Sequence, residues 1–204
     1  MTTPSTPAMK TPLTHLSELS ACDPAVAWVR ESKPESLEAA WLVCERGDWM
    51  LWYAGKKAGP VGDEKRKRLV LATCACVRLA LPIWERCYPK DKRVRDCIET
   101  AEKWVRNEAT LEELQVSRSN CYDAYDAYDA YAPIDAAIDA ASAAYAAASA
   151  AYAASSATAT ASSYAAYAAS YAADAVADAY SATRKKVLKE CAEIVRTFYP
   201  ELPQ

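Results

Sequence analysis

The chain has 204 residues, of which 52% are hydrophobic, and a formal net charge of −3 at pH 7. Four glycines and few β-branched runs argue against sheets and in favour of helices, and the length fits one compact domain or a domain with an appendage. No run is long and apolar enough to span a membrane, because aspartate and serine interrupt the alanine-rich stretch.

Charge divides the chain into three zones. Residues 1–120 have a net charge of +2 and residues 183–204 have a net charge of +2, whereas residues 121–182 contain seven aspartates and no lysine or arginine. The charge pattern predicts a flexible Thr/Pro-rich tail at 1–13 and a helical core domain at 14–120. It further predicts a helical insert at 121–182 and a C-terminal helix at 183–204 that docks on the core.

Capping signals place the first helices. Asp23 is expected to cap a short helix that has Pro24 at its first position, and Ser32 with Glu35 forms a capping-box pattern before the next one. Gly47 should end or bend that helix. The following residue, Asp48, could cap another turn.

The strongest core candidate follows. Asp63 opens a helix that is apolar almost all round from Leu69 to Leu81, and Pro82 must kink it or start a new segment. Residues 94–105 show amphipathic spacing, and Thr110 with Glu113 forms another capping box. A last apolar stripe consists of Val187, Leu188, Cys191, Ile194, Val195 and Phe198.

The middle zone contains 30 alanines and ten tyrosines in 62 residues, which predicts helix. The Ser/Thr-rich stretch 155–163 predicts a turn between two antiparallel helices of roughly 20 residues each. The predicted fold is therefore all-α, a compact helical bundle with an inserted alanine-rich helical hairpin or an extended helical arm.

Three interpretations of the middle zone remain open: a spacer, a partner-binding arm, and a nucleic-acid mimic that presents aspartates. The partner-binding interpretation rests on the preference for tyrosine at interfaces and on the unbalanced negative charge. Its candidate residues are Tyr122, Asp123, Tyr125, Asp126, Tyr128, Asp129, Tyr131, Tyr145, Tyr152, Tyr164, Tyr167 and Tyr171.

No motif for catalysis, a cofactor or a metal is found. Phosphate-binding, dinucleotide-binding and hydrolase motifs are absent, and His15 is the only histidine. The eight cysteines include no CxxC pair, and without a signal peptide they are expected to be reduced in a cytoplasmic protein. Basic residues suggest one candidate site for an anionic ligand, although a solvated helix turn is the commoner meaning: Lys65, Arg66, Arg68 and Arg78.

The segment from Ala40 to Trp49, which reads AWLVCERGDW, matches a known sequence motif. It continues with Leu51-Trp52, Cys74-Ala75-Cys76, Trp84-Glu85-Arg86 and Tyr199-Pro200. These motifs resemble those of the bacterial and phage immunity proteins called Imm5-like, over about residues 14–118 and 183–200, with a variable Ala/Tyr/Asp-rich insert typical of the group.

The resemblance implies a small non-catalytic protein that binds and neutralises a toxin or effector. It carries no catalytic residue. Its motif residues Gly47, Asp48, Trp49 and Trp52 form either a recognition surface or part of the core, and the core is favoured.

Three functions follow from these observations. The first is an immunity-type inhibitor with a protein partner, possibly basic. The second is a phage or host counter-defence protein that sequesters a nucleotide signal or a defence protein. The third is a structural helical module that self-associates as a homo-oligomer. Neither nucleic acid nor a membrane is an expected partner.

Overall fold

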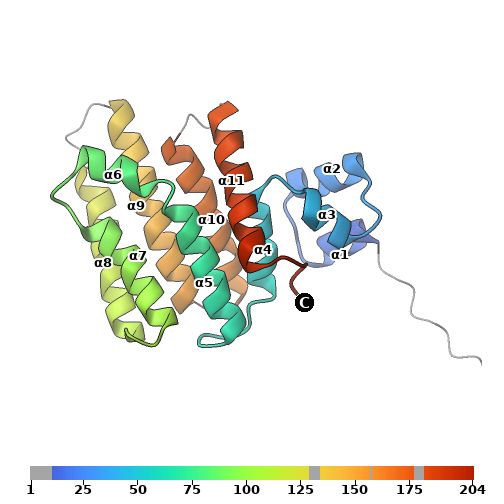
Figure 1. Cartoon of the computed structure of the whole chain (residues 1–204), viewed down its shortest axis with the longest axis horizontal. Helices are drawn as coiled ribbons and strands as arrows, with labels where there is room; N and C mark the ends of the chain where they lie inside the picture. Colours follow the sequence, from blue (N-terminus) through green and yellow to red (C-terminus); the bar gives the residue numbers. More distant parts are fainter. Residues whose placement is uncertain (1–10, 129–133, 157, 177–181) are drawn as a thin grey trace, which may run out of the picture. The chain divides into compact units, whose positions relative to one another are not determined.

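The computed structural model describes residues 11–128, 134–156, 158–176 and 182–204, but not the side chains of 126–128, 134–141 and 158–159. These residues form eleven helices and no strand, so the predicted all-α class is confirmed (Figure 1). None of the described helices is both long and apolar enough to cross a membrane. The chain divides into two compact units, Met1–Val43 and Cys44–Gln204.

The first unit contains α1 (Pro12–Glu18), α2 (Asp23–Ser32) and α3 (Leu37–Val43). Helix α1 begins inside the predicted tail and contains His15, because Pro12 stands at its start and the Thr11 side chain accepts a bond from the Thr14 amide at 3.3 Å. The predicted tail is therefore too long. Its residues 1–10 lie outside the described part of the chain.

Two predicted caps in this unit are wrong. Asp23 is the first helical residue of α2, and Cys22 takes the capping position without a side-chain bond. Ser32 lies in the last turn of α2, where its hydroxyl donates to the Trp28 carbonyl at 2.7 Å. The oxygen of Ser36 accepts from the Ala39 amide at 3.1 Å instead, so α3 is capped one residue after Glu35.

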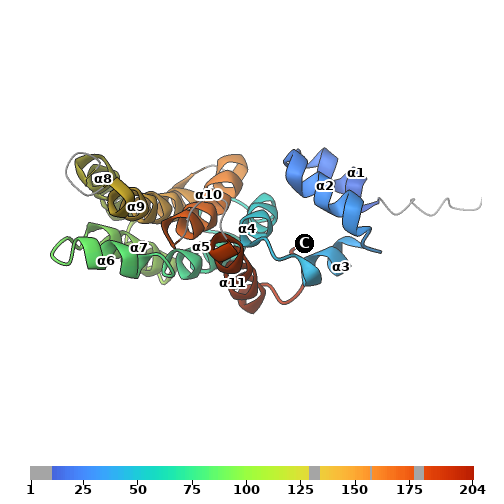
Figure 2. The same cartoon turned by 90° about the horizontal axis from the view of Figure 1, so that it is seen from above.

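The second unit contains eight helices in two layers (Figure 2). One layer consists of α4 (Gly47–Lys56), α8 (Leu111–Tyr128), α9 (Ile134–Ser155) and α10 (Thr158–Val176). The other consists of α5 (Glu64–Val77), α6 (Leu81–Cys87), α7 (Arg93–Val105) and α11 (Ala182–Phe198).

Helix α9 lies at the centre of this unit, in contact with α5, α6, α7, α8 and α10. Alanine makes this position possible, because its short side chain lets neighbouring helices approach on several sides at once. Two buried thiols point at its backbone: Cys97 donates to the Ala147 carbonyl at 3.6 Å and Cys121 to the Ala144 carbonyl at 3.2 Å. The alanine-rich zone thus forms the interior of the bundle, where the sequence suggested an insert or arm.

The predicted border at residue 120 also differs from the structure, because it falls inside α8. The helix begins with the predicted capping box: the Glu113 amide donates to the Thr110 hydroxyl at 3.1 Å, and the Thr110 amide donates to the Glu113 carboxylate at 2.7 Å. From there α8 runs without a break into the Tyr-Asp-Ala repeat. The change in amino-acid composition at residue 120 therefore does not mark the end of a helix.

Other predicted boundaries agree with the structure. The Asp63 side chain accepts from the Lys65 amide at 2.8 Å and caps α5. The apolar run that follows breaks at 78–80, and Pro82 lies in the first turn of α6. Helices α9 and α10 meet between Ser155 and Thr158, inside the Ser/Thr-rich stretch predicted to turn.

Glycines allow α4 to lie close to two neighbours. A Cβ atom added at Gly55 would lie 2.4 Å from the Ser162 Cα atom of α10, and one added at Gly47 would lie 2.4 Å from the Cys191 Cβ atom of α11. Neither distance leaves space for a methyl group, so these crossings depend on glycine.

Helix α11 is held on the bundle by polar contacts at both ends. Arg184 donates to Asp174 at 2.5 Å and to the Ser170 hydroxyl at 2.8 Å, both on α10. Near the other end, the Arg196 guanidinium donates to the carbonyl of Cys44. Buried apolar side chains of α11, including Leu188 and Val195, lie between these contacts.

The buried thiols predict a selective labelling pattern. All eight cysteines are free, but only Cys22 is exposed and only Cys87 is half-buried. Burial raises the pKa of Cys44 to about 11 and raises the pKa of Cys74 as well, so both stay protonated near neutral pH. We expect Cys22 to react rapidly with a disulfide reagent at pH 8 and Cys87 slowly. The six buried thiols should react only after the protein unfolds.

The absorbance of the thiolate released from the reagent measures the number and rate of reacting thiols. Protein unfolded in guanidinium chloride is the control in which all eight thiols react. Rapid reaction of three or more thiols in the native protein would contradict the burial.

Candidate functional site

Seven partly exposed tyrosines gather on the three adjacent helices α8, α9 and α10. We call them the tyrosine face: Tyr122 and Tyr125 of α8, Tyr145 and Tyr152 of α9, and Tyr164, Tyr167 and Tyr171 of α10. The most exposed of them is Tyr167, at 48% of its full accessibility. In the part of α9 whose side chains are described, residues 142–155, the buried residues are almost all alanine and the two tyrosines are the large side chains at the surface.

One half of the face is centred on Tyr145. Its ring centroid lies 4.4 Å from that of Tyr171, 5.8 Å from that of Tyr122 and 5.9 Å from that of Tyr125. The two α8 rings present edges at 74° and 65° to Tyr145. Such tilted and edge contacts are the geometry that aromatic pairs prefer, so this cluster is ordered before any partner arrives.

The other half of the face is centred on Tyr152. Its ring is stacked on that of Tyr164 with centroids 4.0 Å apart, and Tyr164 in turn meets Tyr167 edge-on at 5.9 Å. The Arg118 guanidinium of α8 lies 4.5 Å from the centroid of Tyr152 and donates to the Ser155 hydroxyl at 3.4 Å. A tyrosine of this face therefore already binds a cation. Sequence reasoning missed Arg118, although it stands one helical turn before Tyr122.

Besides Arg118, the face is flanked by a neutral Tyr122 hydroxyl and by Asp123. Burial, followed by the neighbouring Tyr145 and Tyr164, raises the pKa of Tyr122 to about 12, so its hydroxyl stays neutral and can donate a hydrogen bond. Asp123 is exposed. The side chains of Asp126 and Tyr128, and residues Asp129 and Tyr131, belong to the predicted partner-binding set but lie outside the part of the chain that the structure describes.

The four cations of the predicted anion site are not brought together. Arg66 is fully buried and donates to three carbonyl oxygens, of Ala153 at 2.9 Å, Ser156 at 2.8 Å and Gly59 at 2.6 Å. It thus caps the C-terminal end of α9. Arg78 forms a two-pronged ion pair with Glu102 at 2.7 and 2.8 Å. Arg66 is thus engaged inside the fold, whereas Arg78 is paired at the surface, and the structure brings neither of them into a common site with Lys65 and Arg68.

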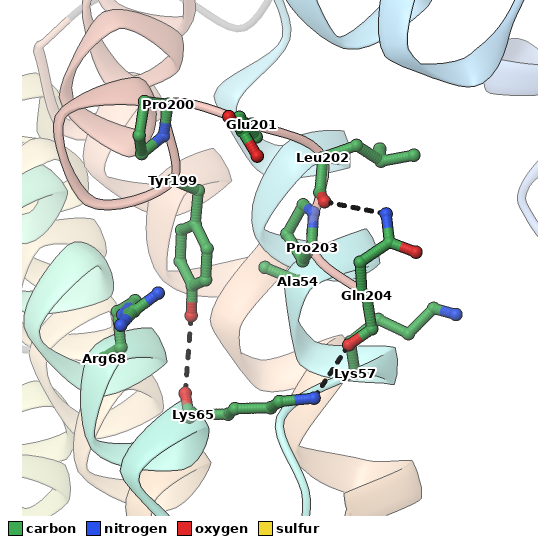
Figure 3. Close-up of a pocket in the computed structure, with 10 residues that line it drawn as sticks. All are labelled: Ala54, Lys57, Lys65, Arg68, Tyr199, Pro200, Glu201, Leu202, Pro203 and Gln204. Carbon is green, nitrogen blue, oxygen red and sulfur yellow. Dashed lines mark hydrogen bonds between the residues drawn. The ribbon is translucent and has the colours of Figure 1, made fainter.

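The other two, Lys65 and Arg68, line a cavity of about 220 Å³ beside the last residues of the chain (Figure 3). Its lining comes from α4, α5 and the segment after α11: Ala54, Lys57, Lys65, Arg68, Tyr199, Pro200, Glu201, Leu202, Pro203 and Gln204. The eight other lining residues, including Lys57 and Tyr199, were not part of the predicted anion site. Tyr199 was noted only as part of the Tyr199-Pro200 motif.

The four motif residues occupy the start of α4 and its middle. Gly47 and Asp48 are buried, and the Arg46 guanidinium donates to both carboxylate oxygens of Asp48 at 2.9 and 2.6 Å. The same guanidinium lies 4.2 Å from the Trp49 ring centroid. Trp49 and Trp52 are half-buried. These contacts support a structural role for Gly47 and Asp48, since both hold the first turn of α4 in place.

Among the described residues, no group of three or more histidine, cysteine or acidic side chains could hold a metal ion. The described residues do form the tyrosine face and a small cavity, both of which are surfaces suited to binding.

Comparison with known families agrees with this architecture. The sequence profile described as Immunity protein Imm5 matches residues 54–184, which is more than half of the chain and includes the alanine-rich helices. The match thus extends across the segment that sequence reasoning treated as a variable insert. No curated protein and no solved structure matches the chain. This chain belongs to the Imm5 immunity protein family.

Proposed function

We propose that the protein is an immunity-type inhibitor, without catalytic activity of its own, that neutralises a protein toxin by binding it directly through the tyrosine face. The observation that carries this proposal is the set of seven tyrosine rings, six half-buried and one exposed, on three adjacent helices. Membership of an immunity protein family supports the same conclusion.

The size and chemistry of the face suit a protein partner. Three helices spaced ~9 Å apart, over the ~10 Å of helix that the tyrosines span, give roughly 300 Å² of surface, enough for the central part of a standard interface, one side of which buries ~800 Å². Tyrosine is enriched in such interfaces because its ring offers large area at a small cost in conformational entropy.

The charge of the zone favours a basic partner. Residues 121–182 contain seven aspartates and no basic residue. The contact of Arg118 with Tyr152 shows how an arginine from a toxin would lie against a neighbouring ring. The net charge of −7 over residues 121–182 opposes self-association of two such zones. A toxin with a basic surface therefore fits better than a second copy of this chain.

The proposal is tested by capture of the tagged full-length protein from its native cells, at low and high salt, with partners identified by mass spectrometry. We expect one stoichiometric protein, encoded beside this gene and released as salt rises. Coexpression should then restore growth that this toxin prevents. Growth arrest that persists despite equal expression of both proteins would exclude the inhibitor function.

The contribution of the face is measured with Tyr167→Ala, because this ring is the most exposed and its loss should disturb the core least. We expect toxin affinity to fall about tenfold or more, as for an aromatic hot-spot residue, with an unchanged melting temperature. The matched control is Val61→Ala, an exposed apolar residue in the loop before α5. Equal affinity of Tyr167→Ala and the control would place the interface elsewhere.

A further inference from the structure

The cavity beside the end of the chain has an unusual balance of charge. Lys57 comes from the end of α4, Lys65 and Arg68 come from α5, and Glu201 is the one acidic residue in the lining. Three cations therefore surround one small space in a protein whose overall net charge is −3. We propose that this cavity binds a phosphate group.

The three cations differ from most arginines of this unit in having no aspartate or glutamate partner among the described residues. Seven arginines do lie within 4 Å of a carboxylate oxygen: Arg46, Arg78, Arg93, Arg95, Arg106, Arg184 and Arg196. At the cavity, by contrast, the Lys65 ammonium donates to the main-chain oxygen of Gln204 at 2.9 Å, and the Arg68 guanidinium lies 5.7 Å from the ring centroid of Tyr199. Both retain donors for an incoming anion.

The volume limits what can enter. At about 220 Å³ the cavity is smaller than the ~300 Å³ at which pockets for drug-sized ligands begin, so it fits a phosphate or pyrophosphate group and not a whole dinucleotide. A larger ligand would have to leave the rest of its structure in solvent. The group that the cavity would recognise is thus a phosphate, whether it is free or at the end of a small metabolite.

The walls are suited to hold such a group in place. Tyr199 is buried, and its hydroxyl donates to the Lys65 carbonyl at 3.4 Å, so it ties the end of α11 to the first turn of α5 (Figure 3). Pro200 and Pro203 restrict the segment that closes one side. Arg68 can offer two parallel N–H donors to phosphate oxygens, while the lysines act as point charges.

The inference is tested by isothermal titration calorimetry of the full chain with pyrophosphate at constant ionic strength. We expect saturable binding at one site, weakened about tenfold or more by Lys65→Ala and by Arg68→Ala. The matched control is Lys67→Ala, which removes the same charge from the same helix but lies outside the cavity, where its ammonium contacts Glu64 at 3.0 Å and Asn107 at 3.1 Å. Its affinity should equal that of the wild type.

Parallel titrations use inorganic phosphate, AMP and acetate. Tighter binding of AMP than of phosphate would assign the group to a small metabolite, and the reverse order would assign it to free phosphate. Both results support the inference. No saturable binding of any phosphate compound, acetate binding as tightly as phosphate, or an equal loss in Lys67→Ala would overturn it.

Discussion

Replacing Arg66 with alanine is expected to lower the free energy of unfolding by about 3–5 kcal/mol. The guanidinium is fully buried and supplies hydrogen bonds to Ala153 and Ser156 at the end of α9 and to Gly59 in the loop before α5. Its loss leaves these carbonyl oxygens without their donor, removes a cation from the negative end of the helix dipole, and opens a cavity. In a chain of this size, this corresponds to a fall of roughly 10 °C in melting temperature.

Urea unfolding followed by circular dichroism measures the effect. Arg68→Ala is the matched control, since it removes the same group from an exposed position two residues later and should change the free energy of unfolding by less than ~0.5 kcal/mol. Arg66→Lys should lie between the two variants, because one ammonium cannot reproduce the separated donors of a guanidinium. A loss below ~1 kcal/mol for Arg66→Ala would show that α9 does not depend on this cap.

The second large effect is expected from Gly55→Ala, which should lower the free energy of unfolding by about 3 kcal/mol. The added methyl carbon would lie 2.4 Å from the Ser162 Cα atom and 2.8 Å from its Cβ atom. Backbone cannot move aside as a flexible side chain can, so α4 and α10 must separate and lose contact along their length. Alanine's better helix propensity returns less than ~1 kcal/mol and does not offset this.

Gly62→Ala is the useful comparison. No atom lies within 4 Å of a Cβ added there, but its φ of +89° is unfavourable for alanine, so a loss of about 1 kcal/mol is expected from the backbone alone. Thermal unfolding of both variants separates the two causes. If Gly55→Ala proved no worse than Gly62→Ala, the close crossing of α4 and α10 would be disproved.

Local signals in the sequence predicted local structure well. The capping box of Thr110 with Glu113, the cap at Asp63 and the turn after Ser155 each depend on residues within a few positions of one another, and each is found. Two predicted caps failed: α2 is capped by Cys22, one residue before Asp23 and without a side-chain bond, and α3 is capped by Ser36 in place of Ser32.

Long-range structure was harder to predict. Alanine has the same small side chain whether a helix is exposed or central, so the pattern of α9 contained no stripe that pointed to its burial. The Lys65–Arg68 run looked solvated for a related reason: only the position of the end of α9 in space shows that Arg66 must turn inward.

The tyrosine face was partly predicted. All seven of its tyrosines belong to the predicted partner-binding set. Only the fold shows that they lie on one surface formed by three helices. It brings Tyr122 and Tyr125 against Tyr145 although the two helices are separated by a segment that the structure does not describe.

The alanines and the tyrosines of α9 lie in different places, which affects how its surface can be altered by mutation. Its described buried residues are mostly alanines, whereas the rings at positions 145 and 152 lie partly at the surface. If the tyrosine face binds the partner, as proposed, substitutions at its seven positions would alter specificity while the alanine packing is kept. These seven positions are therefore the ones to randomise when new specificities are selected on this scaffold.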